Sequence, residues 1–300
     1  MVCSLLDTLN THTQTAASVT DTVLSHTEHK ENIFVELLHH IQDSKSVEIP
    51  FDHIELPHFL PINIFGIEFD LSITKHVVFL WVAAFIVLIV TVAAARRNKK
   101  TLIPKGIGNL IEVFIVFIRD EIVVPNMGRS GIKYMPYLLT TFFFILIMNL
   151  IGLVPYGATS TSNVSVTAGL AIIAFIMIQY SAIRKQGLGH YLAHLTGGMH
   201  WILWPIMIPT EILGLLTKPF VLCIRLFANM TGGHIVIVSL IGLIFIFQTI
   251  WIAPIPIAFL IGINMFEIFV ALLQAYIFTI LTAIFMGLGM QASEHEENSH

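Results

Sequence analysis

After about residue 75, five long apolar runs alternate with short polar segments. A helix needs about 20 predominantly apolar residues to cross the roughly 30 Å hydrocarbon core of a bilayer. The pattern predicts spanning helices at 76–95, 135–155, 166–183, 206–247 and 255–290. We therefore expect an all-α polytopic membrane protein whose membrane domain covers residues 76–290.

The last two runs are longer than one crossing requires. As straight helices, 206–247 would measure about 63 Å and 255–290 about 54 Å. The run 206–247 could form two spans separated at Asn229–His234, where Gly232-Gly233 permits a turn. It could equally form one steeply tilted helix, kinked at Pro219. Two over-long neighbours favour a tilted antiparallel hairpin.

A sixth segment, 104–124, has a different pattern. Lys105, Asn109, Glu112 and Arg119 lie on one helical face, and mainly isoleucine, leucine and phenylalanine lie on the other. An amphipathic helix of this kind is expected to lie in the membrane interface rather than to span the bilayer.

Composition and charge support the membrane assignment and orient the chain. Hydrophobic residues make up 56% and charged residues 11%, against about 25% charged residues in soluble domains. Basic residues follow the first run at Arg96–Lys100 and the third at Arg184-Lys185, so these ends are expected in the cytoplasm. The polar, acidic head, residues 1–75, is then non-cytoplasmic, and the tail, residues 291–300, is cytoplasmic. An acidic head argues against a nucleic-acid partner.

No metal or cofactor site is predicted. The histidines of the head show no recurring ligand spacing, and His190 and His194 lack the glutamate of the zincin motif. Cys3 and Cys223 lie in the head and mid-membrane, so no disulfide is expected. The first residues do not have the features of a signal or transit peptide, which favours a bacterial inner membrane.

Arg225 is the most informative polar residue. An arginine at the centre of a membrane helix costs about 2.5–3.5 kcal/mol on insertion scales, so the default interpretation is a functional charge with a partner. Glu211, Lys218, Arg225 and Asn229 are spaced seven, seven and four apart and share one helical face. His234 lies nine residues after Arg225, on roughly the opposite face. The alternative is a structural ion pair with Glu211 or Glu267.

The last run has its own polar face. Asn264, Glu267 and Gln274 are spaced three and seven apart, and Ala271 between them leaves room. A buried carboxylate between amides suggests a proton relay or an ion site. The alternative is interhelical hydrogen bonding that holds helices together.

Three motifs resemble subunit a of the F-type ATP synthase: Lys218-Pro219 followed by Ile224–Met230 and His234, Glu267–Thr282 with Gln274, and Met148–Pro155. The resemblance covers roughly 76–291. Several bacterial members have Glu at the position of His234 and His at that of Glu267. The exchange suggests that the two positions are close and cooperate.

The resemblance implies a stator subunit that packs its tilted hairpin against a ring of c subunits, each with a membrane carboxylate. Arg225 would face that carboxylate and separate two proton half-channels. His234 and Glu267 would carry protons in the outer half-channel. Asn229, Asn264 and Gln274 would orient Arg225 or water, and Glu211, with Lys218 nearby, would belong to the exit.

The implied partners are the c-ring, the peripheral-stalk subunit b, the rest of the ATP synthase complex and the lipid bilayer. The chain would not be an enzyme on its own. A secondary transporter would predict internal inverted repeats, and none is found. An intramembrane enzyme would need a nucleophile–base pair or a zinc motif within the runs. A purely structural anchor leaves Arg225 unexplained.

Overall fold

The structure is a computed structural model that describes residues 46–49, 52–55, 62–64, 67–69, 74–100, 106–154, 160–187, 189, 191, 204–247 and 254–291. His190, His194 and residues 292–300 of the tail lie outside the described residues. The head contains two antiparallel pairs of short strands, β1 (Ser46–Ile49) with β2 (Asp52–Glu55) and β3 (Ile62–Ile64) with β4 (Ile67–Phe69). Sequence reasoning did not predict these strands, because three or four residues are too few for a clear alternating pattern.

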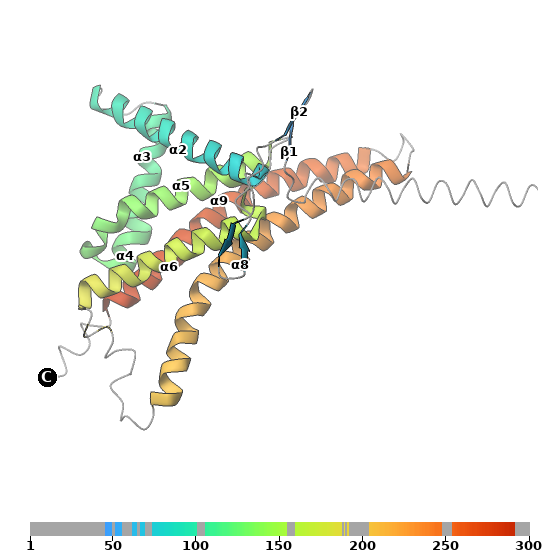
Figure 1. The fold of residues 1–300 in the computed structure, drawn as a ribbon. Helices are drawn as coiled ribbons and strands as arrows, with labels where there is room; N and C mark the ends of the chain where they lie inside the picture. The colour runs from blue at the N-terminus through green and yellow to red at the C-terminus, as the bar shows by residue number, and fades with distance from the viewer. Residues whose placement is uncertain are drawn as a thin grey trace, which may run out of the picture. The chain divides into compact units, whose positions relative to one another are not determined.

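The rest of the described chain is helical (Figure 1). In order, the elements are α2 (Lys75–Lys100), α3 (Ile107–Phe117), the π-helix η1 (Ile118–Val123), α4 (Val124–Met127), the 3₁₀-helix η2 (Arg129–Tyr134), α5 (Met135–Gly152), the 3₁₀-helix η3 (Ser160–Ser162), α6 (Val164–Gln186), α8 (Trp204–Phe247) and α9 (Pro254–Gln291). Within the described part, five helices are long and apolar enough to cross a membrane: α2, η2 with α5, α6, α8 and α9. This confirms the predicted all-α polytopic class with five candidate spans.

The described residues fall into two compact units. The smaller holds residues 234–247 and 254–263, which are the end of α8 and the beginning of α9. The larger holds the strands and all the other described helical residues. Every contact discussed below lies within the larger unit.

The core of the larger unit is built mainly from α5, α6, α8 and α9, and η1 also contributes to it. Each helix buries a stripe of residues spaced three or four apart. The stripes include Leu138, Phe142, Ile145 and Met148 of α5, Ala171, Ala174 and Ile178 of α6, Leu222 and Leu226 of α8, and Ala275, Phe278 and Met286 of α9. The alanines allow close approach, which matters because membrane helices associate mainly through tight packing. At the ends of α6 and α9, Gln186 donates a hydrogen bond to the carbonyl oxygen of Gly289.

The structure decides between the two forms that the sequence allowed for residues 206–247, two spans or one long helix. It is one continuous helix of 44 residues with no turn at Gly232-Gly233. At 35 residues, its apolar part Pro209–Leu243 would extend about 53 Å, well beyond the roughly 30 Å core. The helix is visibly bent (Figure 1) and contains Pro209 and Pro219. A proline inside a helix removes one backbone hydrogen bond and crowds the preceding turn, which explains the bend.

The observed ends of α2 and α6 differ from the predicted ones for two reasons. α2 and α6 continue past the predicted ends, through their basic residues, to Lys100 and Gln186. The basic residues mark the end of the apolar surface. The backbone hydrogen bonds of the helix continue through them, so the helix ends later than the apolar run. α6 also starts two residues early, at Val164, because the Asn163 side chain caps it by accepting a hydrogen bond from the Ser165 amide at 2.8 Å.

The amphipathic segment between the first two spans is more buried than its pattern suggested. α3 leads into η1, whose Ile118, Ile122 and Val123 are fully buried in the core. Leu110 and Val113 are exposed on α3, so the helix also presents apolar surface outward. Arg119 and Asp120 form an exposed ion pair with Nε 2.7 Å from Oδ1. The hydrogen bond from Arg119 holds the pKa of the Asp120 carboxyl below its usual value.

Candidate functional site

The middle of α8 has one buried face and one exposed face. The buried face consists of Leu222, Cys223, Leu226 and Met230, and the exposed face includes Phe220, Val221 and Ile224. An exposed apolar face of a membrane helix is free to contact lipid or another subunit. Arg225 is half-buried and lies at the border of the two faces.

Arg225 points away from α6. The Sγ of Cys223 lies 3.5 Å from the Oγ1 of Thr167 on α6, and two helical residues correspond to a rotation of about 200°. Within the described residues, Arg225 forms no hydrogen bond, and it forms no ion pair with Glu211 or Glu267. The structural ion pair considered from the sequence is therefore not formed, and this part of the chain provides no counter-charge for the guanidinium.

The polar face of α8 turns toward α9. Asn229 donates a hydrogen bond from Nδ2 to the Oε1 of Gln274 at 2.8 Å. Lys218 places its Nζ 5.3 Å from the centre of the Phe285 ring, within the range of a cation–π contact. Residue numbers on α9 fall as those on α8 rise, so the two helices are antiparallel where they meet.

Glu267 is buried against a glycine of the opposite helix. Its side chain is 3% exposed. A Cβ added to Gly233 would lie 2.9 Å from the Cδ of Glu267 and would collide with its Oε1. No hydrogen-bond partner is found for either carboxylate oxygen among the described residues. Glu267 therefore does not act there as a hydrogen-bonded link between helices, whereas Gln274 does.

The other predicted site residues are half-buried. Asn264 lies about one turn before Glu267 on α9, and Glu211 lies about two turns before Lys218 on α8. His234 directly follows Gly233, and its position nine residues after Arg225 places it about 13 Å further along the helix. The structure thus joins Asn229 to Gln274 and Glu267 to Gly233, and it leaves Arg225 without either carboxylate.

Sequence reasoning missed a polar pair near Glu211. Tyr191 donates a hydrogen bond to the Oε1 of Gln179 at 2.6 Å, and the Nε2 of Gln179 is buried with no partner in the described part of the chain. Burial, and secondarily the negative charge of Glu211, raise the pKa of the Tyr191 phenol. The signal was present in the sequence, since Gln179 is the only amide side chain in the run 166–183.

A second missed group lies where α5, η3 and the start of α2 meet. Thr161 donates to the Oδ1 of Asn149 at 2.8 Å, and Ser160 donates to the carbonyl oxygen of His76 at 2.8 Å. Asn149, Ser160 and Thr161 are buried, and the Nδ2 of Asn149 has no partner among the described residues. Ser160 and Thr161 belong to the short polar segment between the second and third apolar runs, yet both are buried. The sequence signal was an asparagine within an apolar run.

These features define a class of protein. Five candidate membrane helices carry an arginine with no counter-charge in the described part of the chain and a buried carboxylate with no hydrogen bond there. Ionisable groups inside the membrane domain are typical of proteins that move ions.

Comparison with known proteins gives the family. Residues 77–287 match the family model described as ATP synthase A chain. The chain is 51% identical over 256 residues to ATP synthase subunit a of Chloroherpeton thalassium, covering 84% of this chain and 76% of the relative. It is 48% identical over 252 residues to ATP synthase subunit a 2 of Chlorobaculum tepidum, covering 83% and 70%. Over 231 residues it is 47% identical to ATP synthase subunit a of Myxococcus xanthus, covering 76% of each chain.

The chain therefore belongs to the ATP synthase A chain family. It is a multi-pass bacterial membrane protein of the membrane sector, connected with proton transport and ATP synthesis, and it is not catalytic on its own.

Proposed function

We propose that this chain is the stator subunit a that forms two proton half-channels beside the c-ring and couples proton flow to rotation. One observation carries the proposal. Arg225 is half-buried beside an apolar surface, and the described part of its own chain offers it no counter-charge. A permanently protonated guanidinium in this position calls for a carboxylate from another subunit.

In this mechanism, Arg225 acts on the c-ring carboxylate. Its positive charge lowers the free energy of the ionised carboxylate, so a protonated c subunit that approaches Arg225 releases its proton. The same charge repels protons and prevents direct passage between the half-channels. Asn229, one turn away, is held by Gln274, which fixes the polar surroundings of the guanidinium.

The outer half-channel is assigned to His234, Asn264 and Glu267. Neither oxygen of Glu267 has a hydrogen-bond partner in the described part of the chain, so no hydrogen bond there has to break before the carboxylate takes up or releases a proton. A histidine titrates near neutral pH, which suits it to a relay. The buried group around Asn149 and Thr161 is proposed as the outer end of this path. The acidic head, residues 1–75, is then on the non-cytoplasmic side of the membrane.

The inner half-channel is assigned to Glu211, assisted by Tyr191 and Gln179. Lys218, two turns along the same helix face, is assigned to this path with Glu211. Its contact with the Phe285 ring makes it a link between α8 and α9. A potential of 100 mV supplies about 2.3 kcal/mol per proton that crosses. The tail, residues 291–300, is then cytoplasmic, and peripheral-stalk subunit b completes the stator.

Cysteine cross-linking tests the proposed contact with the c-ring. In a background with Cys3 and Cys223 replaced by serine, Ile224→Cys places a thiol on the exposed face of α8 beside Arg225. A c subunit with a cysteine one turn from its membrane carboxylate is expected to form a disulfide with it, because the Cα atoms need to approach within about 7 Å. The products are measured by non-reducing electrophoresis of purified complexes.

The matched control is Ile176→Cys on α6. Ile176 is 57% exposed, compared with 43% for Ile224. It is expected to give no product with the same c subunit. Equal cross-linking at the two positions, or cross-linking at Ile176 alone, would contradict the proposed contact surface.

The hydrogen bond between Asn229 and Gln274 gives a further prediction. Asn229→Leu or Gln274→Leu removes a bond worth about 0.5–1.5 kcal/mol. We expect each variant to slow ATP-driven proton pumping about two- to tenfold. Both single variants and the double variant lose the same hydrogen bond. The double variant should therefore pump no more slowly than the more impaired of the two single variants. Multiplied effects in the double variant would show that the two amides act separately.

A further inference from the structure

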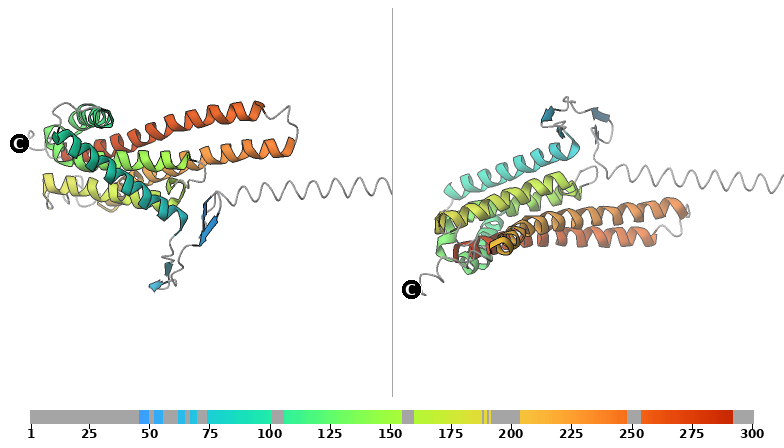
Figure 2. Two further views of the ribbon diagram at one scale, coloured as in Figure 1. Left: turned by 90° about the horizontal axis from the view of Figure 1, so that it is seen from above. Right: turned by 60° about the horizontal axis from the view of Figure 1, so that its bottom comes forward.

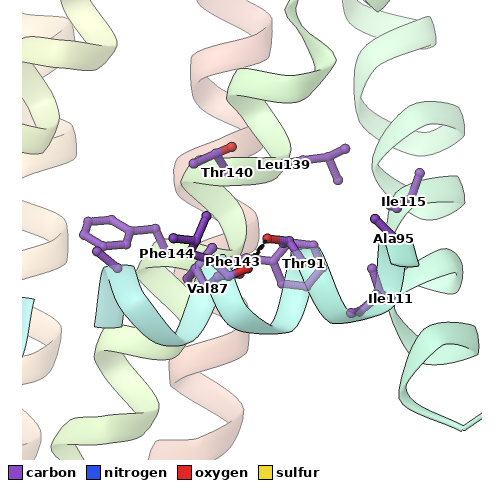
Figure 3. A pocket seen from close by; sticks show the side chains of 12 residues that line it. Val87, Thr91, Ala95, Ile111, Ile115, Leu139, Thr140, Phe143 and Phe144 are labelled. Atoms are coloured by element: carbon purple, nitrogen blue, oxygen red, sulfur yellow. Dashed lines mark hydrogen bonds between the residues drawn. The ribbon is translucent and has the colours of Figure 1, made fainter. Parts of the chain in front are cut away.

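A groove lies between α2, α3 and α5, with a volume of about 600 Å³ (Figure 3). This volume is in the range of about 300–1,000 Å³ that is typical of small-molecule pockets in proteins. Val87 and Thr91 of α2, Ile111 and Ile115 of α3, and Phe143 of α5 line it. None of the site residues discussed above lines this groove.

The groove has no polar side chain that is left without a hydrogen bond by an apolar ligand. Its polar side chains are Thr91 and Thr140. The Thr91 hydroxyl donates to the Val87 carbonyl oxygen at 2.7 Å, and the Thr140 hydroxyl donates to the Pro136 carbonyl oxygen at 2.8 Å. Since both hydroxyls bond within their own helices, the lining suits a hydrocarbon chain.

The length of the groove matches one leaflet of a bilayer. Along α2, the lining residues run from Ala84 to Ala95, which is about 17 Å at 1.5 Å per residue. Half of the roughly 30 Å hydrocarbon core is about 15 Å. A partner helix is about 10–12 Å across and would need a trough along the whole span. One acyl chain fits this length better than a helix.

The end of the groove is basic. Arg96 directly follows Ala95 and is exposed, and the chain continues Arg97, Asn98, Lys99, Lys100. Four positive charges within five residues at the end of a membrane helix attract anionic lipid headgroups. Along α2, the apolar groove comes first and the positive charges follow. A phospholipid has the same arrangement, with its acyl chain next to its charged phosphate.

We propose that this groove is a binding site for one anionic phospholipid. An acyl chain lies against Val87, Ile111 and Phe143, and the phosphate binds Arg96 at the membrane surface. The lipid fills the space between α2, α3 and α5 and thereby holds the first span against the bundle.

Native mass spectrometry of the purified complex tests the site. Delipidated complex is titrated with phosphatidylglycerol, and the retained molecules per complex are counted. Ala95→Trp fills the groove at its basic end, and Arg96→Gln with Arg97→Gln removes two of the four positive charges there. Each is expected to retain one phosphatidylglycerol fewer than the unmodified complex. Phosphatidylcholine, which carries no net charge, is expected not to occupy the site.

The control is Ala93→Trp, which adds the same side chain at an exposed position of α2 outside the lining. It should retain as much phosphatidylglycerol as the unmodified complex. Equal retention in all variants, equal loss in Ala93→Trp, or equal retention of phosphatidylcholine would overturn the proposal. Loss of subunit b from the Ala95→Trp complex would also overturn it, because the groove would then hold a partner helix.

Discussion

Replacing Arg225 by alanine is expected to lower ATP-driven proton pumping at least a hundredfold while the complex still assembles. The guanidinium has no hydrogen-bond or ion-pair partner in the described part of its own chain, so its removal breaks no polar interaction there. What is lost is the proposed partner of the c-ring carboxylate. Removing one member of a buried charge pair costs about 3–5 kcal/mol, and every 1.4 kcal/mol corresponds to a factor of ten.

The measurement is quenching of a pH-sensitive dye in inverted membrane vesicles, with assembly followed by co-purification of the c-ring. Passive proton leak through the same vesicles should be unchanged or raised, because the barrier between the half-channels is gone. Arg225→Lys should also be impaired, since a desolvated lysine can lose its proton whereas arginine stays charged.

The control is Arg184→Ala. Arg184 is exposed at the end of α6 and donates to the Tyr180 hydroxyl at 2.7 Å. Its loss removes a positive charge from the same membrane domain and should leave pumping near the unmodified rate. Normal pumping by Arg225→Ala would instead make Arg225 a structural residue and remove the main support for the proposed mechanism.

The spanning helices could be predicted because their signal is local. A run of about 20 apolar residues is sufficient, and five such runs correspond to α2, α5, α6, α8 and α9. The continuity of α8 could not be decided from the sequence, because Gly232-Gly233 is compatible with both a turn and a helix. In the structure α8 passes through both glycines, and Gly233 leaves space for Glu267.

The polar faces of α8 and α9 were likewise visible as periodicity within each helix. Their mutual register was not, because helical periodicity says nothing about which residue of α8 lies opposite which residue of α9. The bond between Asn229 and Gln274 and the contact of Lys218 with Phe285 depend on this register. For the same reason, the sequence could not exclude an ion pair between Arg225 and a carboxylate of its own chain.

Gly233→Ala is expected to lower proton pumping about tenfold or more, whereas Gly232→Ala should leave it nearly unchanged. The added Cβ at Gly233 collides with the Glu267 carboxylate, while a Cβ at Gly232 meets nothing within 4 Å. Overpacking of this kind costs about 1–3 kcal/mol. Both substitutions gain the same helix propensity, about 0.8–1.0 kcal/mol, so the comparison isolates the collision.

A second-site change shows whether the collision itself is responsible. Glu267→Asp shortens the side chain by one methylene and keeps the carboxylate, so it should relieve the contact with Ala at position 233. We expect the double variant Gly233→Ala with Glu267→Asp to assemble and pump better than Gly233→Ala alone. If the double variant is no better, or if Gly232→Ala is equally impaired, then the close packing of Glu267 on Gly233 does not govern proton access. If pumping recovers in the double variant, then α8 positions the Glu267 carboxylate by having no side chain at Gly233.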